Sequence, residues 1–425
     1  MQYQPGQHLI KAGDEGDCAF IIGEGRVAIQ AKDTDGHVQF LRYAGRNEIL
    51  GEMALLIGGK RTADVVAQEK VDAIKITAGL FEKIIARSNS LGEAVSELLI
   101  ERLLTLDEAS RRIGNYQIDD KLGMAAMGVV FRGFHMRLNR PVAIKFLFHH
   151  LALQKECKEI FQRETELLSS LAHPNIVGVH DAGTAFRTLY LVMDLIEGTT
   201  LNNILKEEQK LSPIKTRRFL VPLLDALAAA SERGIVHRDV KPPNIIIDVS
   251  GRAMLMDFGL AMFQTSPQEE DLYGTVEYCS PEQIEGGAID GRSDIYSLGI
   301  TAYEMLTGTV PFKAADAYDV INMHMTRTVP DVRTKIPDCP ADLAYFIHRA
   351  TRRDPKERFA DAREAQRSLL GDSPVATRKR RRISIEFDAD REAEVEKLWS
   401  KFYDKLAGIK GVQIEEGTGA DAGQA

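Results

Sequence analysis

The sequence predicts an α+β protein with two folded domains and a tail. Three observations predict it: residues 1–80 form short apolar segments between turns, residues 90–112 have a helical apolar period, and residues from 113 onward change from strands to helices near residue 200. A length of 425 residues fits two or three domains at about 150 residues each. We therefore divide the chain into 1–112, 113–370 and 371–425.

Composition and charge exclude several classes of protein. Hydrophobic residues make up 44% and charged residues 27% of the chain, which is enough apolar material for folded cores and excludes a wholly disordered chain. The formal net charge of −8 is unfavourable for general binding to nucleic acid, so we expect no nucleic-acid partner. No pattern in the sequence indicates an oligomeric state.

The cysteines and the apolar runs indicate the compartment. The four cysteines lie far apart without a C-x-x-C pair, which argues against a disulfide scaffold and a structural zinc site: Cys18, Cys157, Cys279 and Cys339. No uncharged apolar run reaches the roughly 18 residues of a membrane span. The N-terminus carries charged residues where a secretory signal would be apolar. We expect a cytoplasmic protein without a membrane span.

The N-terminal block predicts a small antiparallel roll. Segments such as Cys18–Ile22, Arg26–Gln30 and Ala63–Ala67 are apolar or alternate, and turns rich in Gly, Asp and Pro separate them. Many short strands at close spacing favour a roll or barrel. Beyond them, apolar residues recur at helical spacing, so we expect an amphipathic helix over about 90–112 that connects to the next domain.

A phosphate-binding pattern lies inside this block. Leu50-Gly51-Glu52-Met53-Ala54-Leu55 is a glycine turn entering a short helix, whose backbone N–H groups favour a phosphate. Arg61-Thr62-Ala63 follows, and an arginine binds phosphate with its planar fork. With the turns at Pro5-Gly6 and Gly13-Asp14, residues 1–112 resemble the cyclic-nucleotide-binding domains, with helices after residue 80 as a lid. The alternative is a structural Arg–Glu pair in an ordinary roll.

That resemblance implies a cyclic nucleotide bound by Gly51, Glu52, Met53, Ala54, Arg61, Thr62 and Ala63. The glutamate would accept from a ribose hydroxyl. Thr62 directly after Arg61 resembles the cGMP-dependent kinases, in which a hydroxyl meets the guanine amino group, whereas cAMP-dependent kinases more often have alanine. One hydroxyl contributes only about 1 kcal/mol. The pattern therefore favours cGMP slightly, and cAMP remains open.

The second block contains a set of motifs in a distinctive order. They are Val142-Ala143-Ile144-Lys145, Gln162-Arg163-Glu164, His237-Arg238-Asp239-Val240-Lys241-Pro242-Pro243-Asn244, Asp257-Phe258-Gly259, Ser280-Pro281-Glu282 and Ser293-Asp294. This order and spacing resemble the serine/threonine protein kinases, in particular the bacterial ones, over about residues 113–370. The resemblance implies two lobes, one rich in strands and one helical. A sensor before a kinase resembles the cGMP-dependent protein kinases.

The kinase resemblance assigns a role to each motif residue. Asp239 would orient the substrate hydroxyl, Lys241 would contact the γ-phosphate, and Lys145, held by Glu164, would bind the ATP phosphates. Asn244 and Asp257 would hold Mg²⁺. Other ATP contacts would come from Leu122, Gly123, Gly128, Val130, Ala143, Met193, Asp194 and Glu197. The cofactors implied are ATP and Mg²⁺, and the partners are proteins with Ser or Thr acceptors.

One departure from the family pattern concerns the phosphate loop. The family has G-x-G-x-x-G-x-V, whereas this chain has Ala125 at the middle glycine between Gly123 and Gly128. Alanine has a Cβ and rarely takes a positive φ, so we expect ATP binding to survive in weakened form. The alternative function is a cyclic-nucleotide sensor with an inactive kinase fold that acts as a scaffold.

Control and structural residues follow from the same resemblance. Glu282 is expected to pair with Arg358. Thr275 would line the acceptor site. The candidate phosphorylation sites are Thr265, Ser266, Thr275 and Ser384. Ser384 follows the basic run 378–382, which resembles a basophilic kinase substrate; a basic linker or a contact with an anionic surface is the alternative. Cyclic nucleotide would regulate the kinase through the 90–112 helix.

Overall fold

The computed structural model describes residues 1–32, 38–57, 60–86, 88, 90, 92–97, 111–125, 127–153, 155–258 and 276–370, without the side chains of residues 32, 56, 57, 86, 155, 156, 160 and 164. The chain divides into two units, Met1–Pro374 and Val375–Ala425, and every described residue belongs to the first. In this part of the chain, no helix has the length and apolar character needed to cross a bilayer.

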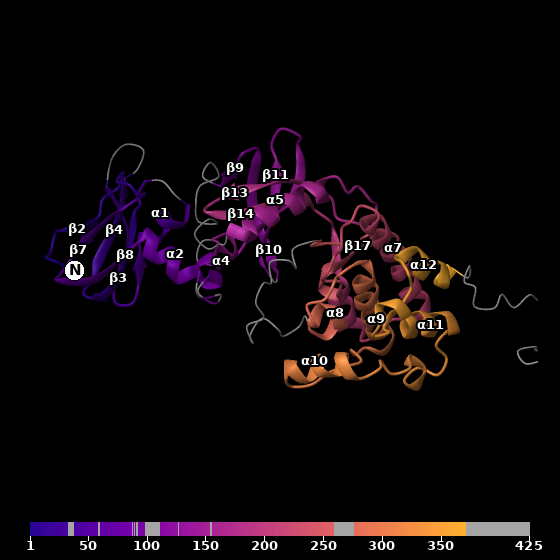
Figure 1. Ribbon diagram of the computed structural model, residues 1–425. Helices are drawn as coiled ribbons and strands as arrows, with labels where there is room; N and C mark the ends of the chain where they lie inside the picture. Colours follow the sequence, from indigo (N-terminus) through magenta and orange to yellow (C-terminus); the bar gives the residue numbers. More distant parts are fainter. Residues whose placement is uncertain are drawn as a thin grey trace, which may run out of the picture. The chain divides into compact units, whose positions relative to one another are not determined.

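Two antiparallel four-stranded sheets form the N-terminal roll (Figure 1). One has the order β1 (Gln2–Tyr3), β8 (Val71–Thr77), β3 (Cys18–Glu24), β6 (Ile49–Leu50). The other has the order β2 (His8–Ile10), β7 (Asp64–Ala67), β4 (Val27–Lys32), β5 (Val38–Ala44). Apolar side chains of both sheets, among them Phe20, Val27 and Val65, meet in one core. The predicted roll is confirmed, and the predicted strand segments agree closely with β3, β4 and β7.

Among the described residues, three helical segments accompany the roll. Helix α1 (Glu52–Ile57) follows β6 after the single residue Gly51, and α2 (Ala78–Ala86) follows β8 directly. Residues 92–97, called the connector segment below, are also helical. The predicted helix over 90–112 is described only in part, because residues 98–110 lie outside the described residues.

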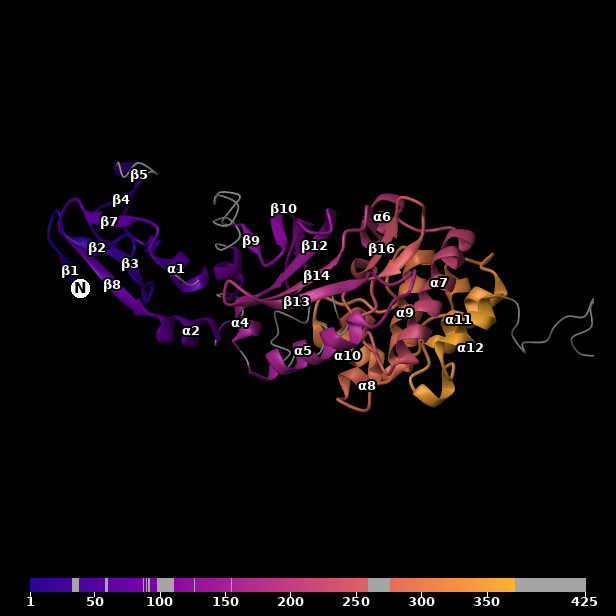
Figure 2. The same cartoon turned by 90° about the horizontal axis from the view of Figure 1, so that it is seen from above.

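A six-stranded antiparallel sheet forms the N-lobe of the second domain. Its strand order is β13 (Val179–Ala185), β14 (Thr188–Asp194), β12 (Arg140–Leu147), β11 (Gly128–His135), β10 (Tyr116–Ala125), β9 (Arg112–Ile113). Helices α4 (His149–Ala152) and α5 (Lys155–Ser169) follow β12, and α5 packs against β13 (Figure 2). Ile144 and Phe131 are fully buried in the core of this lobe.

Helices dominate the chain from residue 201 onward, as predicted. They are α6 (Leu201–Glu208), α7 (Pro213–Ser231), α8 (Pro281–Ile284), α9 (Gly291–Thr307), α10 (Ala317–Thr326), α11 (Ala341–Ala350) and α12 (Ala362–Leu370), with 3-10 turns at Pro242–Asn244, Val276–Tyr278, Val332–Thr334 and Pro355–Glu357. A small sheet of β15 (Gly198–Thr200), β16 (Ile245–Asp248) and β17 (Ala253–Leu255) completes this C-lobe.

The sequence of α9 explains its place at the centre of the C-lobe. Its residues from Ser293 to Tyr303 are all buried, as expected for a helix with apolar side chains around its circumference. The side chain of Asp290 caps its first turn by accepting from the backbone N–H of Arg292. Gly308, in the left-handed conformation with φ 76°, ends it. Helices α7, α11 and α12 pack against it.

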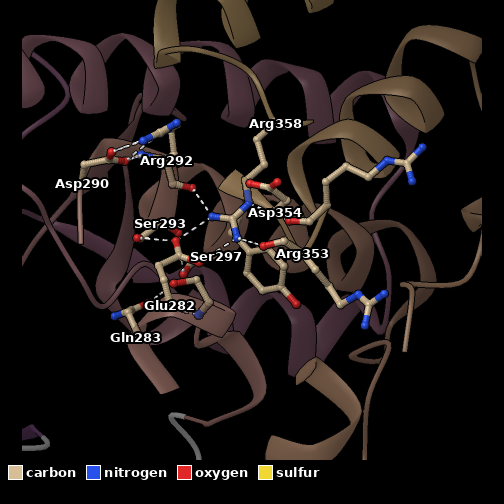
Figure 3. A network of polar contacts seen from close by, with 12 residues as sticks. Glu282, Gln283, Asp290, Arg292, Ser293, Ser297, Arg353, Asp354 and Arg358 are labelled. Carbon is tan, nitrogen blue, oxygen red and sulfur yellow. Dashed lines mark hydrogen bonds and ion pairs between the residues drawn. The ribbon is translucent and has the colours of Figure 1, made fainter. Parts of the chain in front are cut away.

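A buried ion pair joins α8 to the loop before α12 (Figure 3). Arg358 Nη1 and Nη2 donate to the two carboxylate oxygens of Glu282, both at 2.7 Å. Ser293 donates a further hydrogen bond to Glu282. Burial opposes ionisation of Glu282, but the charge and hydrogen bonds of Arg358, together with the hydrogen bond from Ser293, outweigh burial and lower the pKa of the carboxyl. The predicted pair between Glu282 and Arg358 is confirmed.

Breaking this pair should destabilise the second domain. Arg358→Met leaves the Glu282 charge buried without its partner, which costs about 3–5 kcal/mol in the free energy of unfolding. Urea unfolding followed by circular dichroism measures the loss. Arg333→Met removes an exposed pair with Asp331 of 2.7 Å, and this matched control should change the free energy by about 1 kcal/mol or less. Equal effects of the two substitutions would contradict the prediction.

Candidate functional site

Three residues predicted for catalysis and metal binding lie together in the loop before β16. Lys241 Nζ is 2.9 Å from Asp239 Oδ1. Asn244 Nδ2 donates to Asp239 Oδ2 at 2.7 Å and to the backbone carbonyl of the same residue at 2.8 Å. The Asp239 carboxylate is therefore oriented from two sides by a cation and an amide.

Asp294 of α9 holds the backbone of this loop in place. Its two carboxylate oxygens accept from the backbone N–H groups of His237 at 2.8 Å and Arg238 at 2.7 Å. The carboxyl is buried, which raises its pKa, while these two bonds act in the opposite direction. Arg238 has a φ of 68°, a conformation rare for a residue with a side chain. Asp294 is a positioning residue. It was named from the sequence as part of a motif, but this role was not assigned to it.

Lys145 pairs with Asp257. The Lys145 side chain is almost fully buried, and Nζ lies 2.8 Å from Asp257 Oδ1. Asp257 Oδ1 is buried and accepts no hydrogen bond from the described residues. Its ion pair with the Lys145 ammonium is the contact that the structure records for it. Glu164 lies in α5, and its side chain is outside the described residues. The predicted pair of Lys145 with Glu164 therefore stays a prediction.

The register of the N-lobe sheet puts several predicted ATP contacts on one face. Val130 of β11 lies opposite Lys145 of β12, and Ala143 of β12 lies opposite Met193 of β14. Directly opposed residues of antiparallel strands have side chains on the same face, and Ala143 and Lys145 are two apart. These four side chains therefore share the face on which Lys145 meets Asp257.

The remaining predicted contacts lie around this face with less burial. Asp194, at the end of β14, accepts from His180 Nε2 at 2.7 Å and from the backbone of Gly178. Glu197 is exposed, and its carbonyl accepts from the backbone of Val249. Leu122 on β10 is also exposed. The structure brings none of these three side chains into a described contact with Lys145 or Asp239.

The phosphate loop is a hairpin between β10 and β11. Ala125 lies opposite Gly128 in the strand register and does not have a positive φ. The backbone φ at Ala125 is therefore one that alanine adopts readily and does not require glycine. Gly128 differs, because a Cβ there would overlap the carbonyl oxygen of Phe146, whereas a Cβ on Gly123 would meet open space.

The N-terminal roll contains a second buried cation, Arg61, which is held by backbone groups. The Arg61 guanidinium is buried and donates to the carbonyl oxygens of Gly51 at 2.7 Å and Cys18 at 2.5 Å. Its ion pair with Asp17 is long, at 3.7 Å, and that carboxylate is mostly exposed. Carbonyl groups orient the guanidinium without neutralising it, which leaves its charge available to an anion.

Of the predicted cyclic-nucleotide residues, Gly51 contacts Arg61, and the others follow Gly51 or Arg61 directly in the chain. Gly51 has a φ of 79°, and a Cβ there would lie 2.7 Å from Arg61 Nη1, so glycine meets both a conformational and a steric requirement. Helix α1 begins directly after it with the predicted set Glu52, Met53 and Ala54, of which Glu52 and Ala54 are buried. Thr62 is exposed beside Arg61, and Ala63 is partly buried.

Four predicted residues cannot be placed. Thr265, Ser266, Thr275 and Ser384 lie outside the described residues, and their phosphorylation stays a prediction.

Comparisons with known proteins agree with this geometry. Residues 116–369 match the model of the protein kinase domain family, and residues 1–88 match that of the cyclic nucleotide-binding domain. The chain therefore belongs to the protein kinase family and carries a cyclic nucleotide-binding domain at its N-terminus.

Bacterial proteins are among the relatives of the kinase domain. The chain is 33% identical over 304 residues to serine/threonine-protein kinase PrkC of Bacillus subtilis, covering 71% of this chain and 47% of that protein. It is 37% identical over 250 residues to serine/threonine-protein kinase PknL of Mycobacterium tuberculosis, covering 58% of this chain and 63% of that protein. The chain thus spans about half to two-thirds of the length of these relatives. A solved structure, the Mycobacterium tuberculosis PknI kinase domain, is 28% identical with a TM-score of 0.53, covering 63% of this chain and 100% of that chain.

The two glycines of the phosphate loop should differ in their tolerance of a side chain. Gly128→Ala forces the β11–β12 pair apart at Phe146, next to Lys145. Overpacking costs about 1–3 kcal/mol, which corresponds to a roughly 5- to 150-fold loss in kcat/KM for ATP when it falls on the position of Lys145. Gly123→Ala introduces the same methyl group into open space and should cost much less. Steady-state kinetics against ATP concentration measures both, and equal losses would contradict the steric argument.

Proposed function

We propose that this protein transfers the γ-phosphate of ATP to Ser or Thr hydroxyls of other proteins, and that a cyclic nucleotide bound at the N-terminal domain regulates the transfer. The observation that carries the proposal is the orientation of the Asp239 carboxylate by both Lys241 and Asn244. A carboxylate positioned in this way is the group that phosphoryl transfer to a hydroxyl requires.

The residues present fit ATP with Mg²⁺. The side chains of Asn244 and Asp257 offer the oxygen ligands that Mg²⁺ prefers, and the described partner of buried Asp257 Oδ1 is a cation, Lys145. Magnesium ions on the phosphates neutralise the charge that develops during transfer. Asn244 and Asp257 would hold the metal, and Lys145 would exchange its contact with Asp257 for the phosphates.

The chain's own groups supply the remaining chemistry. Asp239 would receive the hydrogen bond of the acceptor hydroxyl and hold its proton as the oxygen attacks. Lys241, already 2.9 Å from that carboxylate, would offer positive charge to the transferring phosphate. Asp294 keeps the loop rigid through its two backbone bonds, so the carboxylate needs little reorganisation.

At the N-terminal domain, we assign the phosphate of the cyclic nucleotide to Arg61 and the N–H groups that follow Gly51. Glu52 would accept from the ribose hydroxyl. The exposed hydroxyl of Thr62 beside Arg61 supports cGMP over cAMP. Control of the kinase requires that the nucleotide bind one arrangement of the chain better than another.

Substitution of the catalytic carboxylate separates a kinase from an inactive scaffold. Asp239→Asn keeps the shape and the Asn244 contact but removes the proton acceptor, so kcat should fall by about 10²- to 10⁴-fold. Phosphate transfer to a mixed peptide library with Ser and Thr acceptors measures it. Asp331→Asn, which alters an exposed surface pair, should retain full activity. An inactive wild-type protein would favour the scaffold alternative.

Titration calorimetry with cAMP and cGMP tests the sensor. We expect the wild-type chain to bind cGMP more tightly, and Thr62→Ala to weaken cGMP by roughly fivefold with little change for cAMP, since it removes one hydrogen bond. Arg61→Ala should abolish measurable binding of both nucleotides because it removes the cation at the phosphate. A tenfold preference of the wild type for cAMP would overturn the cGMP assignment.

A further inference from the structure

One buried imidazole joins the connector segment to the kinase N-lobe. The Ser96 hydroxyl accepts from the backbone N–H of His149, the first residue of α4, at 3.1 Å, and lies 2.9 Å from His149 Nδ1. His149 Nε2 lies 3.0 Å from the carbonyl oxygen of Phe186, in the turn between β13 and β14. Burial lowers the pKa of His149 to about 4, so the ring is neutral and its Nε2–H donates to Phe186. Three segments distant in sequence are thereby linked.

The same turn makes a second contact with the sensor domain. Arg187 Nη1 donates to Glu82 Oε1 of α2 at 3.1 Å. Phe186 and Arg187 have φ values of 51° and 56°, which residues other than Gly, Asn and Asp rarely adopt. Such conformations persist only where the surroundings hold them. The Phe186 ring packs against Phe146, with centroids 5.7 Å apart.

The connector segment also approaches α4 more closely than a side chain would allow. A Cβ at Gly92 would lie 2.7 Å from His150 Cβ and closer still to its ring. Gly79 of α2 provides a contrast, because a Cβ there would meet nothing within 4 Å. Close approach at Gly92 and the hydrogen bonds at Ser96 therefore belong to one docking contact.

Both halves of this contact lie next to elements that build the ATP site. Only residues 153 and 154 separate α4 from α5, the helix that contains Glu164. Strand β14 begins at Thr188, directly after the turn, and runs past Met193 to Asp194. Its Leu191 is the cross-strand partner of Lys145. A shift of the connector segment would therefore reach the phosphate-binding lysine through α4 and β14.

We propose that the sensor acts on the kinase through this docking contact, formed by Glu82, Gly92 and Ser96 on one side and His149, Phe186 and Arg187 on the other. The inference rests on the proposed function. It names the non-covalent contact by which the cyclic-nucleotide domain affects the kinase domain, in addition to the covalent link through residues 98–111. These are positioning residues, because they act on Lys145 through α4 and β14. Binding linkage also requires that an ATP-site ligand change the cyclic-nucleotide affinity by the same factor.

The test uses the full-length protein and adds a methyl group at Gly92, where it overlaps His150 and pushes the connector segment away from α4. Gly92→Ala should disturb the contact, and Gly79→Ala is its control, since both replace a helical glycine of the same domain. ATP KM and kcat are measured with the mixed peptide library, without nucleotide and with saturating cAMP or cGMP. Calorimetry confirms that each variant still binds the cyclic nucleotide.

We expect Gly92→Ala to change the ATP KM of the nucleotide-free protein by about fivefold or more and to remove most of the cyclic-nucleotide response. Ser96→Ala should act in the same direction. Gly79→Ala should match the wild type. Glu82→Arg and Arg187→Glu should each shift the ATP KM by roughly two- to fivefold, and combining the two should restore it, because the exposed ion pair is re-formed with its charges exchanged.

A wild-type ATP KM and a wild-type response in Gly92→Ala would overturn the docking proposal. If neither nucleotide changes the activity of the wild-type protein, cyclic-nucleotide regulation fails as a function. The docking contact is then decided by the nucleotide-free ATP KM alone, which Gly92→Ala must change and Gly79→Ala must not.

Discussion

The proposed catalytic centre depends on one buried carboxylate, that of Asp294. It accepts from two consecutive backbone N–H groups, His237 and Arg238, and so sets the path of the loop that presents Asp239. Burial of a charged group costs free energy that these charge-assisted bonds offset. The carboxylate can hold the loop because α9 is capped at both ends, buried along most of its length and packed against α7, α11 and α12. The packing of a buried helix thus sets the position of the proposed catalytic side chain.

The two proposed phosphate sites hold their cations with different partners. Arg61 is oriented by the carbonyl oxygens of Gly51 and Cys18, which are dipoles, so most of its charge stays available. Lys145 is paired with a full charge on Asp257. A ligand of the first site needs only to meet a prepared guanidinium, whereas a ligand of the second must also compensate Asp257. Metal ions that accompany a nucleotide supply that compensation.

Much of this site could be predicted from short motifs because they encode local geometry. The glycine before Glu52 and the order of the motifs around Asp239 each require particular residue types at particular spacings, and the pair of Glu282 with Arg358 follows from the same pattern. The structure records a contact of Lys145 with Asp257 that was not predicted from the sequence, while the pair of Lys145 with Glu164 stays a prediction because that side chain lies outside the described residues. The contact with Asp257 joins residues 112 positions apart, which no local pattern encodes. The conformation of Ala125 likewise follows from strand register, not from its residue type.

The sequence by itself determined the two families and the order of the domains, and it named the residues proposed to meet phosphate, since each depends on backbone conformation and charge within a few positions. Only the tertiary structure decided what holds those residues: Asp294 beneath the catalytic loop, the carbonyl groups around Arg61, and the contact of Ser96 with His149. These partners lie between 10 and 57 positions apart in the chain. Their contacts arise when buried helices and strands pack, and packing depends on the shapes of whole surfaces, which a motif does not describe.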